Sequence, residues 1–295
     1  MTGSSTLTIS GGGMRADLAP ALGGAVLFLG DRRGPMLRAG AAAAVAADPR
    51  AAAIFPCVPW FGRLQSDLAA QGRAASLRAT LPDASPLPLH GDGWISPWTV
   101  IRHDETVIRH DEDRLVCRLT VPPSPSRFPF AYSAQQEFRL EGAALRIALS
   151  LRNEDDVPMP AGLGLHPYFV RTRSTRVSFQ AAGFWTPPGS SAGRLSALPS
   201  SLGAGAPAVL PDETLDHSFT GVAGKAIVSD AANAVRLTSD APFLHVYAPA
   251  GEAFFCLEPV THLPGEFLGA STDFGARLLA PGEEMSLRLV IDRPF

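Results

Sequence analysis

The sequence predicts an all-β protein, and three observations carry that prediction. Several segments place large apolar residues at every second position, which is the pattern of half-buried strands. Glycine and proline are abundant, at 28 and 27 of 295 residues, and both are typical of turns and loops rather than central strands. Only residues 39–53 favour a helix through their alanines, and Asp48 followed by Pro49 limits that segment to one short helix.

The strands can be placed in order along the chain. Residues 145–152 alternate most clearly, residues 134–140 alternate just before them, and Glu141 with Gly142 marks a turn, so we expect a hairpin. Further strands are expected at 114–121, 177–181, 234–238, 243–247, 253–258 and 285–291. Segments rich in Pro, Ser, Ala and Gly predict surface loops at 81–88, 122–129 and 186–211.

Composition indicates an ordinary globular chain, with 46% hydrophobic and 18% charged residues. We expect one domain over residues 1–295, and a cytoplasmic protein without a membrane partner, because no apolar run reaches the roughly 18 to 20 residues of a bilayer span. A net charge of -3 argues against a basic surface that binds nucleic acid. The sequence leaves monomer and homodimer equally open.

Cysteine and lysine usage narrows the chemistry. The three cysteines lack CxxC spacing, so neither a disulfide framework nor a zinc knuckle is expected. Lys225 is the only lysine, which argues against Schiff-base chemistry and a phosphate-binding P-loop.

Three short segments, 89–94, 164–169 and 256–262, each place an ionisable side chain among Gly, Pro, aromatic or aliphatic neighbours. Such a group is costly to bury unless it is paired or used, which singles out His90, His166 and Glu258. With ordinary pKa values of about 6.5 and 4.3, histidine and glutamate suit an acid and base pair at neutral pH. We expect His166 and Glu258 to face each other across a cleft that admits one sugar ring. The histidines outside these contexts receive no catalytic role: His103, His110, His217, His245 and His262.

The order and spacing of four motifs resemble the aldose 1-epimerase (mutarotase) family over nearly the whole chain. The motifs are FPCVPWFGRL at 55–64, PLHGDGW at 88–94, MPAGLGLHPYF at 159–169 and CLEPVTH at 256–262. The resemblance implies a large twisted β-sandwich of the galactose-mutarotase type with an open sugar cleft. It also implies interconversion of the anomers of a free monosaccharide, with no cofactor and no metal.

The resemblance also implies roles for individual residues. Glu258 matches the base that takes the proton of the anomeric hydroxyl, and His166 matches the acid that protonates the ring oxygen. His90 matches the histidine that supports the developing aldehyde. Hemiacetal opening needs one proton removed and one delivered, each positioned group contributing roughly 10²–10⁴-fold, so neither lysine nor metal is required.

Four further residues are expected to hold the substrate. Arg63 matches an arginine that binds sugar hydroxyls, and Asp216, within a DHxF-like pattern, matches an aspartate that binds distal hydroxyls. Trp94 and Tyr168 flank the motifs and could stack on the apolar face of a pyranose.

The chain departs from the family pattern at two positions, and several alternatives stay open. Gly62 stands where the family has asparagine before the arginine, and Leu268 stands where asparagine is frequent, so the sugar remains open. A hexose-phosphate epimerase of the same fold would use arginines such as Arg63 and Arg73. A non-catalytic carbohydrate-binding sandwich, or a metal-dependent β-barrel with two His and one Glu ligand, are further alternatives.

Overall fold

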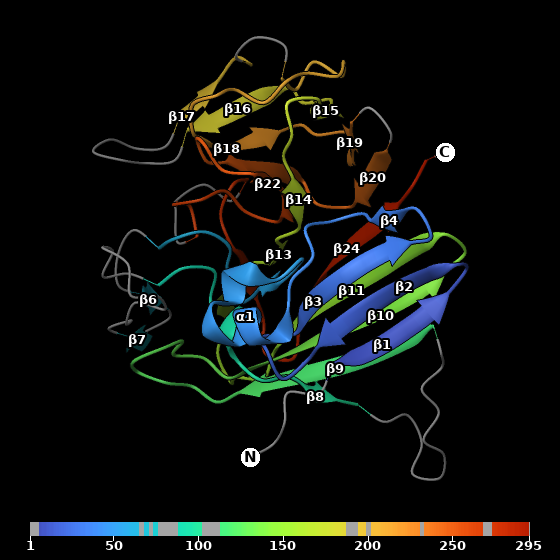
Figure 1. The fold of residues 1–295 in the computed structure, drawn as a ribbon. Helices are drawn as coiled ribbons and strands as arrows, with labels where there is room; N and C mark the ends of the chain where they lie inside the picture. The colour runs from blue at the N-terminus through green and yellow to red at the C-terminus, as the bar shows by residue number, and fades with distance from the viewer. Residues whose placement is uncertain are drawn as a thin grey trace.

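The computed structural model confirms the all-β fold class, with strands arranged in two large sheets and a smaller third one (Figure 1). The structure describes residues 6–64, 68–70, 73–75, 88–101, 113–186, 194–198, 202–230, 233–267 and 273–294. The expected loop at 81–88, except for residue 88, and parts of the loop at 186–211 lie outside these ranges, as do His103, His110 and Leu268.

The first eight-stranded sheet, sheet I, is antiparallel throughout. Its strands in spatial order are β15 (Arg176–Phe179), β19 (Lys225–Ser229), β20 (Ala234–Ser239), β24 (Glu284–Asp292), β11 (Ala144–Asn153), β10 (Tyr132–Glu141), β9 (Arg114–Val121) and β8 (Thr99–Val100). The expected hairpin is β10 and β11, which turn at Gly142 with a positive φ of 59°. The strands expected from alternation at 114–121, 177–181, 234–238 and 285–291 are confirmed here, each within two residues at either end.

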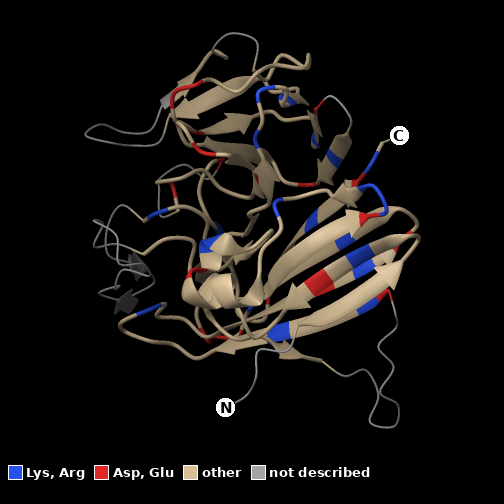
Figure 2. Cartoon of the chain, viewed as in Figure 1, with Lys and Arg blue, Asp and Glu red and all other residues tan. Residues whose placement is uncertain are grey.

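A four-stranded sheet lies against sheet I (Figure 1). It consists of β1 (Leu7–Gly11), β2 (Met14–Ala19), β3 (Ala25–Asp31) and β4 (Gly34–Pro35). Buried side chains of both sheets form one hydrophobic cluster, and the Gln136 amide reaches across to donate to the Gly24 carbonyl at 3.1 Å. Charged side chains of both signs alternate on the outer face of these strands, as in the 2.7 Å pair of Arg15 with Asp17 (Figure 2). None of these four strands was expected from the sequence.

The second large sheet, sheet II, lies beside β15, β19 and β20 of sheet I at the top of Figure 1. Its strands in spatial order are β17 (Arg194–Ser196), β16 (Gly183–Thr186), β18 (Leu215–Thr220), β21 (Phe243–Ala248), β22 (Phe254–Val260), β13 (Gly164–Leu165) and β5 (Pro56–Cys57), with β14 (Tyr168–Val170) also paired to β22. The strands expected at 243–247 and 253–258 are therefore confirmed as β21 and β22. Both faces of β22 are buried, since six of its seven residues are buried.

The remaining elements are short. They are β12 (Met159–Ala161) paired with β23 (Arg277–Leu279), β6 (Leu68–Ala70) paired with β7 (Arg73–Ala75), the helix α1 (Ala42–Ala47), and the 3₁₀ turns η1 (Pro49–Ala51) and η2 (Gly93–Ile95). The single short helix is confirmed. It ends before Asp48, whose side chain accepts from Arg50 N at 3.0 Å at the start of η1. Within the described ranges no helix has the length and apolarity to cross a membrane.

Candidate functional site

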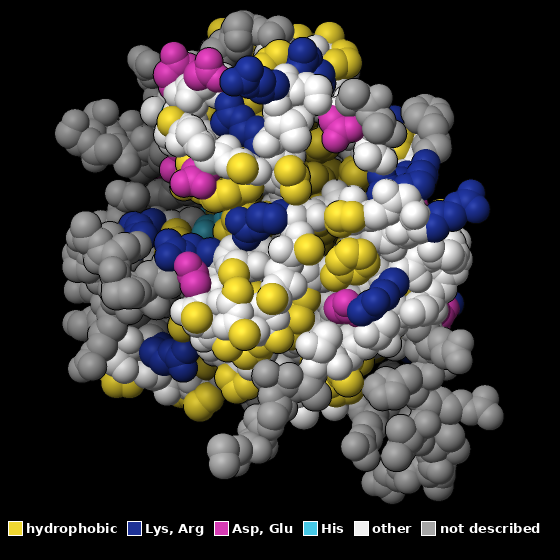
Figure 3. Space-filling model, viewed as in Figure 1, with side chains coloured by type: hydrophobic (Ala, Val, Ile, Leu, Met, Phe, Trp, Pro, Cys, Tyr) yellow, Lys and Arg dark blue, Asp and Glu magenta, His cyan; other side chains and the backbone are white. Residues whose placement is uncertain are grey.

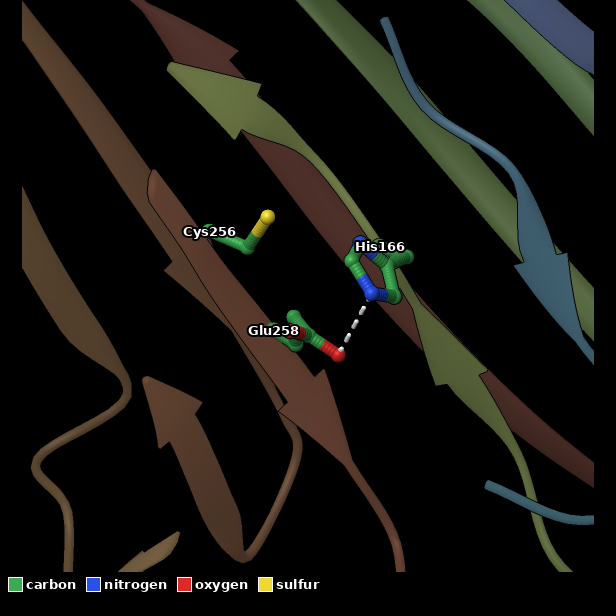
Figure 4. A group of neighbouring side chains, drawn as sticks. All are labelled: His166, Cys256 and Glu258. Atoms are coloured by element: carbon green, nitrogen blue, oxygen red, sulfur yellow. Dashed lines mark ion pairs between the residues drawn. The ribbon is translucent and has the colours of Figure 1, made fainter. Parts of the chain in front are cut away.

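Strand register brings His166 and Glu258 together. On either side of His166, Gly164 pairs with Val260 and Tyr168 pairs with Cys256, so continuing this antiparallel register sets His166 opposite Glu258. Directly opposed residues of neighbouring strands project from the same face of a sheet. The HPY and EPV motifs are therefore two adjoining strand segments of sheet II, and their two ionisable side chains point toward one another (Figure 4).

The two side chains are in contact. His166 Nε2 lies 3.3 Å from Glu258 Oε2, and the side chains are only 6% and 1% exposed. Within the described chain neither Glu258 oxygen nor His166 Nδ1 has a hydrogen-bond partner. The expectation that a sugar ring fits between the two groups is therefore wrong, because at this distance a substrate must lie over the pair. Both oxygens that exchange protons in a hemiacetal are bonded to the same carbon, so an adjacent acid and base suit that reaction.

Burial governs the charge of this pair. It raises the pKa of Glu258 well above its usual value, with the charge of Asp216 as a second cause. Burial also lowers the pKa of His166 well below its usual value, assisted by His90 and His245. Both shifts favour the uncharged forms. When both groups are uncharged, the carboxylic acid carries the one proton of the pair, and Glu258 Oε2 lies 3.3 Å from His166 Nε2.

His90 is oriented by the backbone around it. Its φ of 58° is left-handed, and the adjoining Gly91 has a φ of 69°. The Gly62 N–H donates to His90 Nδ1 at 3.0 Å, which leaves the proton of the neutral ring on Nε2. Burial, followed by the charges of His245 and Arg63, lowers the pKa of His90 to about 3. His90 is therefore a neutral hydrogen-bond donor rather than a source of protons.

Gly62 itself has a φ of 75°, which explains the departure from asparagine at this position. Both glycine and asparagine tolerate left-handed backbone more readily than other residues. The contribution of Gly62 to the site is its backbone N–H, and this contribution needs no side chain.

Aromatic rings pack against the site histidines. Phe55 lies 4.4 Å from the His166 ring and 4.9 Å from Trp94, centroid to centroid. Tyr168 stacks on His166 at 4.7 Å and carries the Arg38 guanidinium 3.8 Å above its own ring. Trp94 is 1% exposed and donates to the Leu89 and Gly91 carbonyls, so it packs behind Phe55 without facing solvent.

A row of polar residues extends from Glu258 across sheet II, and the sequence analysis had missed its central member. His245 pairs with Glu258 on one side and with Ser218 on the other, so all three share a face. Ser218 Oγ lies 2.9 Å from His245 Nδ1, and His245 Nε2 lies 3.0 Å from Asp216 Oδ1. Burial acts to raise the pKa of Asp216, but the hydrogen bond and charge of His245 outweigh it and the pKa lies below its usual value. The one sequence signal for His245 is that it is a polar residue within an otherwise apolar predicted strand.

The rim of the site is basic. Figure 3 shows a histidine at the bottom of a hollow, with Lys or Arg side chains around its edge. The charge of Arg63 helps to lower the pKa of His90, and that of Arg38 helps to lower the pKa of His166. These two arginines therefore lie near the two histidines. Asp216 projects from the sheet with 62% of its side chain exposed. Arg73 belongs to β7, whose side chains lie outside the description.

Three further ionisable residues, two of them in the motifs, make structural contacts. His262 Nε2 accepts from the Phe61 N–H at 2.9 Å, which holds the segment before Arg63 in place. Asp92 accepts from the Tyr132 hydroxyl and lies 3.6 Å from Arg127 Nε. His217 projects from the opposite face to Asp216 and packs 4.4 Å from Phe184.

Comparison with known proteins places this geometry in a family. The chain is 32% identical over 304 residues to the uncharacterized protein YphB of Escherichia coli K12, covering 96% of this chain and 98% of that one. The crystal structure of a candidate aldose 1-epimerase from Escherichia coli K12 superposes with a TM-score of 0.84 at 28% identity, covering 99% of both chains. A galactose mutarotase-like protein from Lactobacillus casei ATCC 334 shares the fold, with a TM-score of 0.76 at 17% identity over 98% of this chain and 100% of that one. The aldose 1-epimerase family model matches residues 6–292, and the chain therefore belongs to the aldose 1-epimerase family.

Proposed function

We propose that this protein is a mutarotase, which interconverts the α and β anomers of a free monosaccharide without a cofactor. The observation that carries the proposal is the buried contact of His166 Nε2 with Glu258 Oε2 at 3.3 Å, in which neither carboxylate oxygen is otherwise hydrogen-bonded within the described chain. A buried carboxyl left without partners costs roughly 1–3 kcal/mol or more, and a role in proton transfer accounts for its retention.

The reaction uses the one proton that the pair holds. Hydrogen bonds from sugar hydroxyls favour the ionised carboxylate, so this proton moves to His166 when the sugar binds. Glu258 then takes the proton of the anomeric hydroxyl, the bond from C1 to the ring oxygen breaks, and His166 Nε2 gives its proton to that oxygen. Rotation about C1–C2 exposes the other face of the aldehyde, and the reverse transfers close the other anomer and restore both groups.

The surrounding residues hold the sugar over the pair. His90 donates its Nε2 proton to an oxygen near the reacting carbon, because its Nδ1 is engaged by Gly62. Arg63 and the exposed Asp216 bind hydroxyls farther from the reacting carbon. Tyr168 forms the apolar wall beside His166, while Trp94 acts from the layer behind Phe55.

The test is anomer exchange measured by polarimetry and by NMR exchange spectroscopy on a panel of aldohexoses, aldopentoses and hexose phosphates. We expect Glu258→Gln and His166→Asn each to lower the rate for the preferred sugar by about 10²–10⁴-fold. Glu284→Gln, at the start of β24 in sheet I, is the carboxyl control, and His217→Asn, on the opposite face of β18, is the matched imidazole control. Both controls should keep the parental rate.

The alternatives predict different results on the same panel. A carbohydrate-binding module would bind a sugar without accelerating exchange in any variant. A hexose-phosphate epimerase would act on phosphorylated sugars in preference to free ones. An unchanged rate in Glu258→Gln with every accepted sugar would refute the assignment of the base.

A further inference from the structure

A thiol adjoins the acid–base pair. Cys256 and Glu258 are two residues apart on β22, so both side chains project from the same face of the strand. One donor atom each of His166, Cys256 and Glu258 lie within 4.8 Å of one another, and all three residues are buried (Figure 4). The proposed sugar chemistry assigns no role to the thiol.

The donor set matches a borderline-soft divalent cation. Sulfur, imidazole nitrogen and carboxylate oxygen are the three ligand types that zinc takes from proteins, usually in a tetrahedron. With bonds of about 2.1 Å, two nitrogen or oxygen ligands of a tetrahedral zinc lie about 3.4 Å apart. The observed separation of His166 Nε2 from Glu258 Oε2 is 3.3 Å. Three protein ligands would leave the fourth zinc position for water.

The carboxylate of the cluster also has unused hydrogen-bond acceptors that a cation can bind. Both Glu258 oxygens lack hydrogen-bond partners within the described chain, although the side chain is only 1% exposed. A cation at this carboxylate would therefore break no hydrogen bond to it. The unpartnered, buried carboxylate is an observation independent of the cysteine, and it also favours a cationic ligand.

Charge balance is favourable for a doubly charged ion. The Cys256 thiolate and the Glu258 carboxylate each supply one negative charge as ligands, so they balance the two charges of a bound Zn²⁺ ion within the buried cluster. Binding displaces the protons that these two groups carry.

We propose that His166, Cys256 and Glu258 form an inhibitory zinc site, in which Zn²⁺ occupies the two proton-transfer groups and anchors itself on the Cys256 thiolate. Zinc binding stands on the donor geometry alone. Inhibition rests on the proposed function, because it follows only if His166 and Glu258 must be free to exchange protons with a sugar.

Zinc binding is tested on the full-length protein after removal of metals with a chelator. Isothermal titration with Zn²⁺ should give one equivalent, and Co²⁺ as a probe should produce a thiolate-to-cobalt charge-transfer band. Two released protons should raise the apparent affinity about 100-fold per pH unit while both groups remain protonated in the empty site. Titrations in buffers of different ionisation enthalpy count those protons directly.

The variants separate Cys256 from the other thiols. Cys256→Ser and Cys256→Ala should lose the cobalt band and weaken zinc binding by more than about 100-fold, since even outer-shell partners of a metal contribute 10–100-fold. Cys117→Ser, which removes a buried thiol from sheet I, is the matched control and should bind as the parent does. Equal zinc affinity in the parent and in both Cys256 variants would overturn the site. The cobalt spectrum of the parent alone decides the question if a variant does not fold.

Inhibition is measured as anomer exchange with and without Zn²⁺, each rate divided by the same protein's rate in chelator. The parent and Cys117→Ser should lose exchange at zinc concentrations that leave the Cys256 variants unaffected, and chelator should restore it. Faster exchange with zinc would overturn inhibition. One-equivalent binding by a protein that exchanges no sugar would support the site while refuting both inhibition and the proposed mutarotase activity.

Discussion

Sheets I and II use burial in different ways. Along β11 and β24 of sheet I, buried and more exposed residues alternate almost without exception, because one face meets the core and the other meets solvent. Along β22 of sheet II the alternation is lost, because both faces are covered. The strands β11 and β24 therefore show an alternating pattern in the sequence, while β22, which was also predicted, is a continuous apolar segment with one glutamate.

Buried polar groups also differ between the sheets. In sheet I, the buried Gln136 donates to the Gly24 carbonyl and links two sheets. In sheet II, Glu258 is equally buried, yet neither of its oxygens is hydrogen-bonded within the described chain. A satisfied buried group supports the fold, whereas an unsatisfied one costs stability. The comparison assigns stability to sheet I and chemistry to sheet II.

The largest expected effect that tests this division comes from Leu149→Ala in β11. Leu149 is fully buried and lies opposite Leu287, so the truncation should lower the free energy of unfolding by about 2–5 kcal/mol. Anomer exchange per folded molecule should stay at the parental rate. Urea denaturation and exchange assays on the same samples measure both quantities.

Leu257→Ala is the counterpart in β22, where Leu257 is fully buried beside Glu258. It should lower stability similarly and also lower exchange, because small displacements of a catalytic group can cost about 100-fold. Equal exchange per folded molecule in the two variants would break the comparison.

A smaller effect is expected in the pH dependence of stability. The folded-state pKa of Glu258 is raised, so its contribution to stability is complete below the usual value of 4.5 and is lost as pH rises through the folded value. In this window the free energy of unfolding of the parent, relative to Glu258→Gln, should fall by at most about 1.4 kcal/mol per pH unit.

Denaturation midpoints at closely spaced pH values from about 4 to 9 measure this difference. A difference that stays constant over that range would mean that the carboxyl ionises in the folded protein as it does in water. Gln136→Met in sheet I removes an uncharged group and should give a pH-independent difference from the parent.

The smallest effect is expected at the polar row of sheet II. Ser218→Ala removes the hydroxyl 2.9 Å from His245 Nδ1, which loosens the imidazole that contacts Asp216. A typical hydrogen bond contributes about 0.5–1.5 kcal/mol, so KM should rise about 2- to 10-fold with kcat unchanged. Ser133→Ala in β10 removes a comparable buried hydroxyl, bonded to Glu154 at 2.6 Å, and should leave KM unchanged. A fall in kcat for Ser218→Ala would instead connect the row to proton transfer.

The sequence predicted sheet I better than sheet II for a physical reason. Alternation marks a strand only when it runs over enough residues, so 145–152 was evident, while β16, with four residues, and β18, whose last three residues are all buried, were not expected. The four strands β1 to β4 were missed although β2 alternates in burial, because their small residues and glycines weaken the apolar pattern.

The sequence predicted which residues belong to the candidate site, but it did not predict how they are arranged. His90, His166 and Glu258 stood out because each is ionisable among residues that avoid water. The direct contact of His166 with Glu258 depends on the register of β13 and β14 against β22, which no local pattern contains. His245 was missed for the same reason, since its neighbours Ser218 and Glu258 lie on other strands.

The left-handed backbone of His90 has an evolutionary consequence. Within the described chain it is the one non-glycine residue with positive φ, a conformation that costs a side chain of this kind about 1 kcal/mol or more. Glycine would adopt it without that cost. The buried imidazole, however, fills its site and accepts from the Gly62 N–H, so a lineage that replaced it with glycine would exchange backbone strain for a cavity and an unpaired donor.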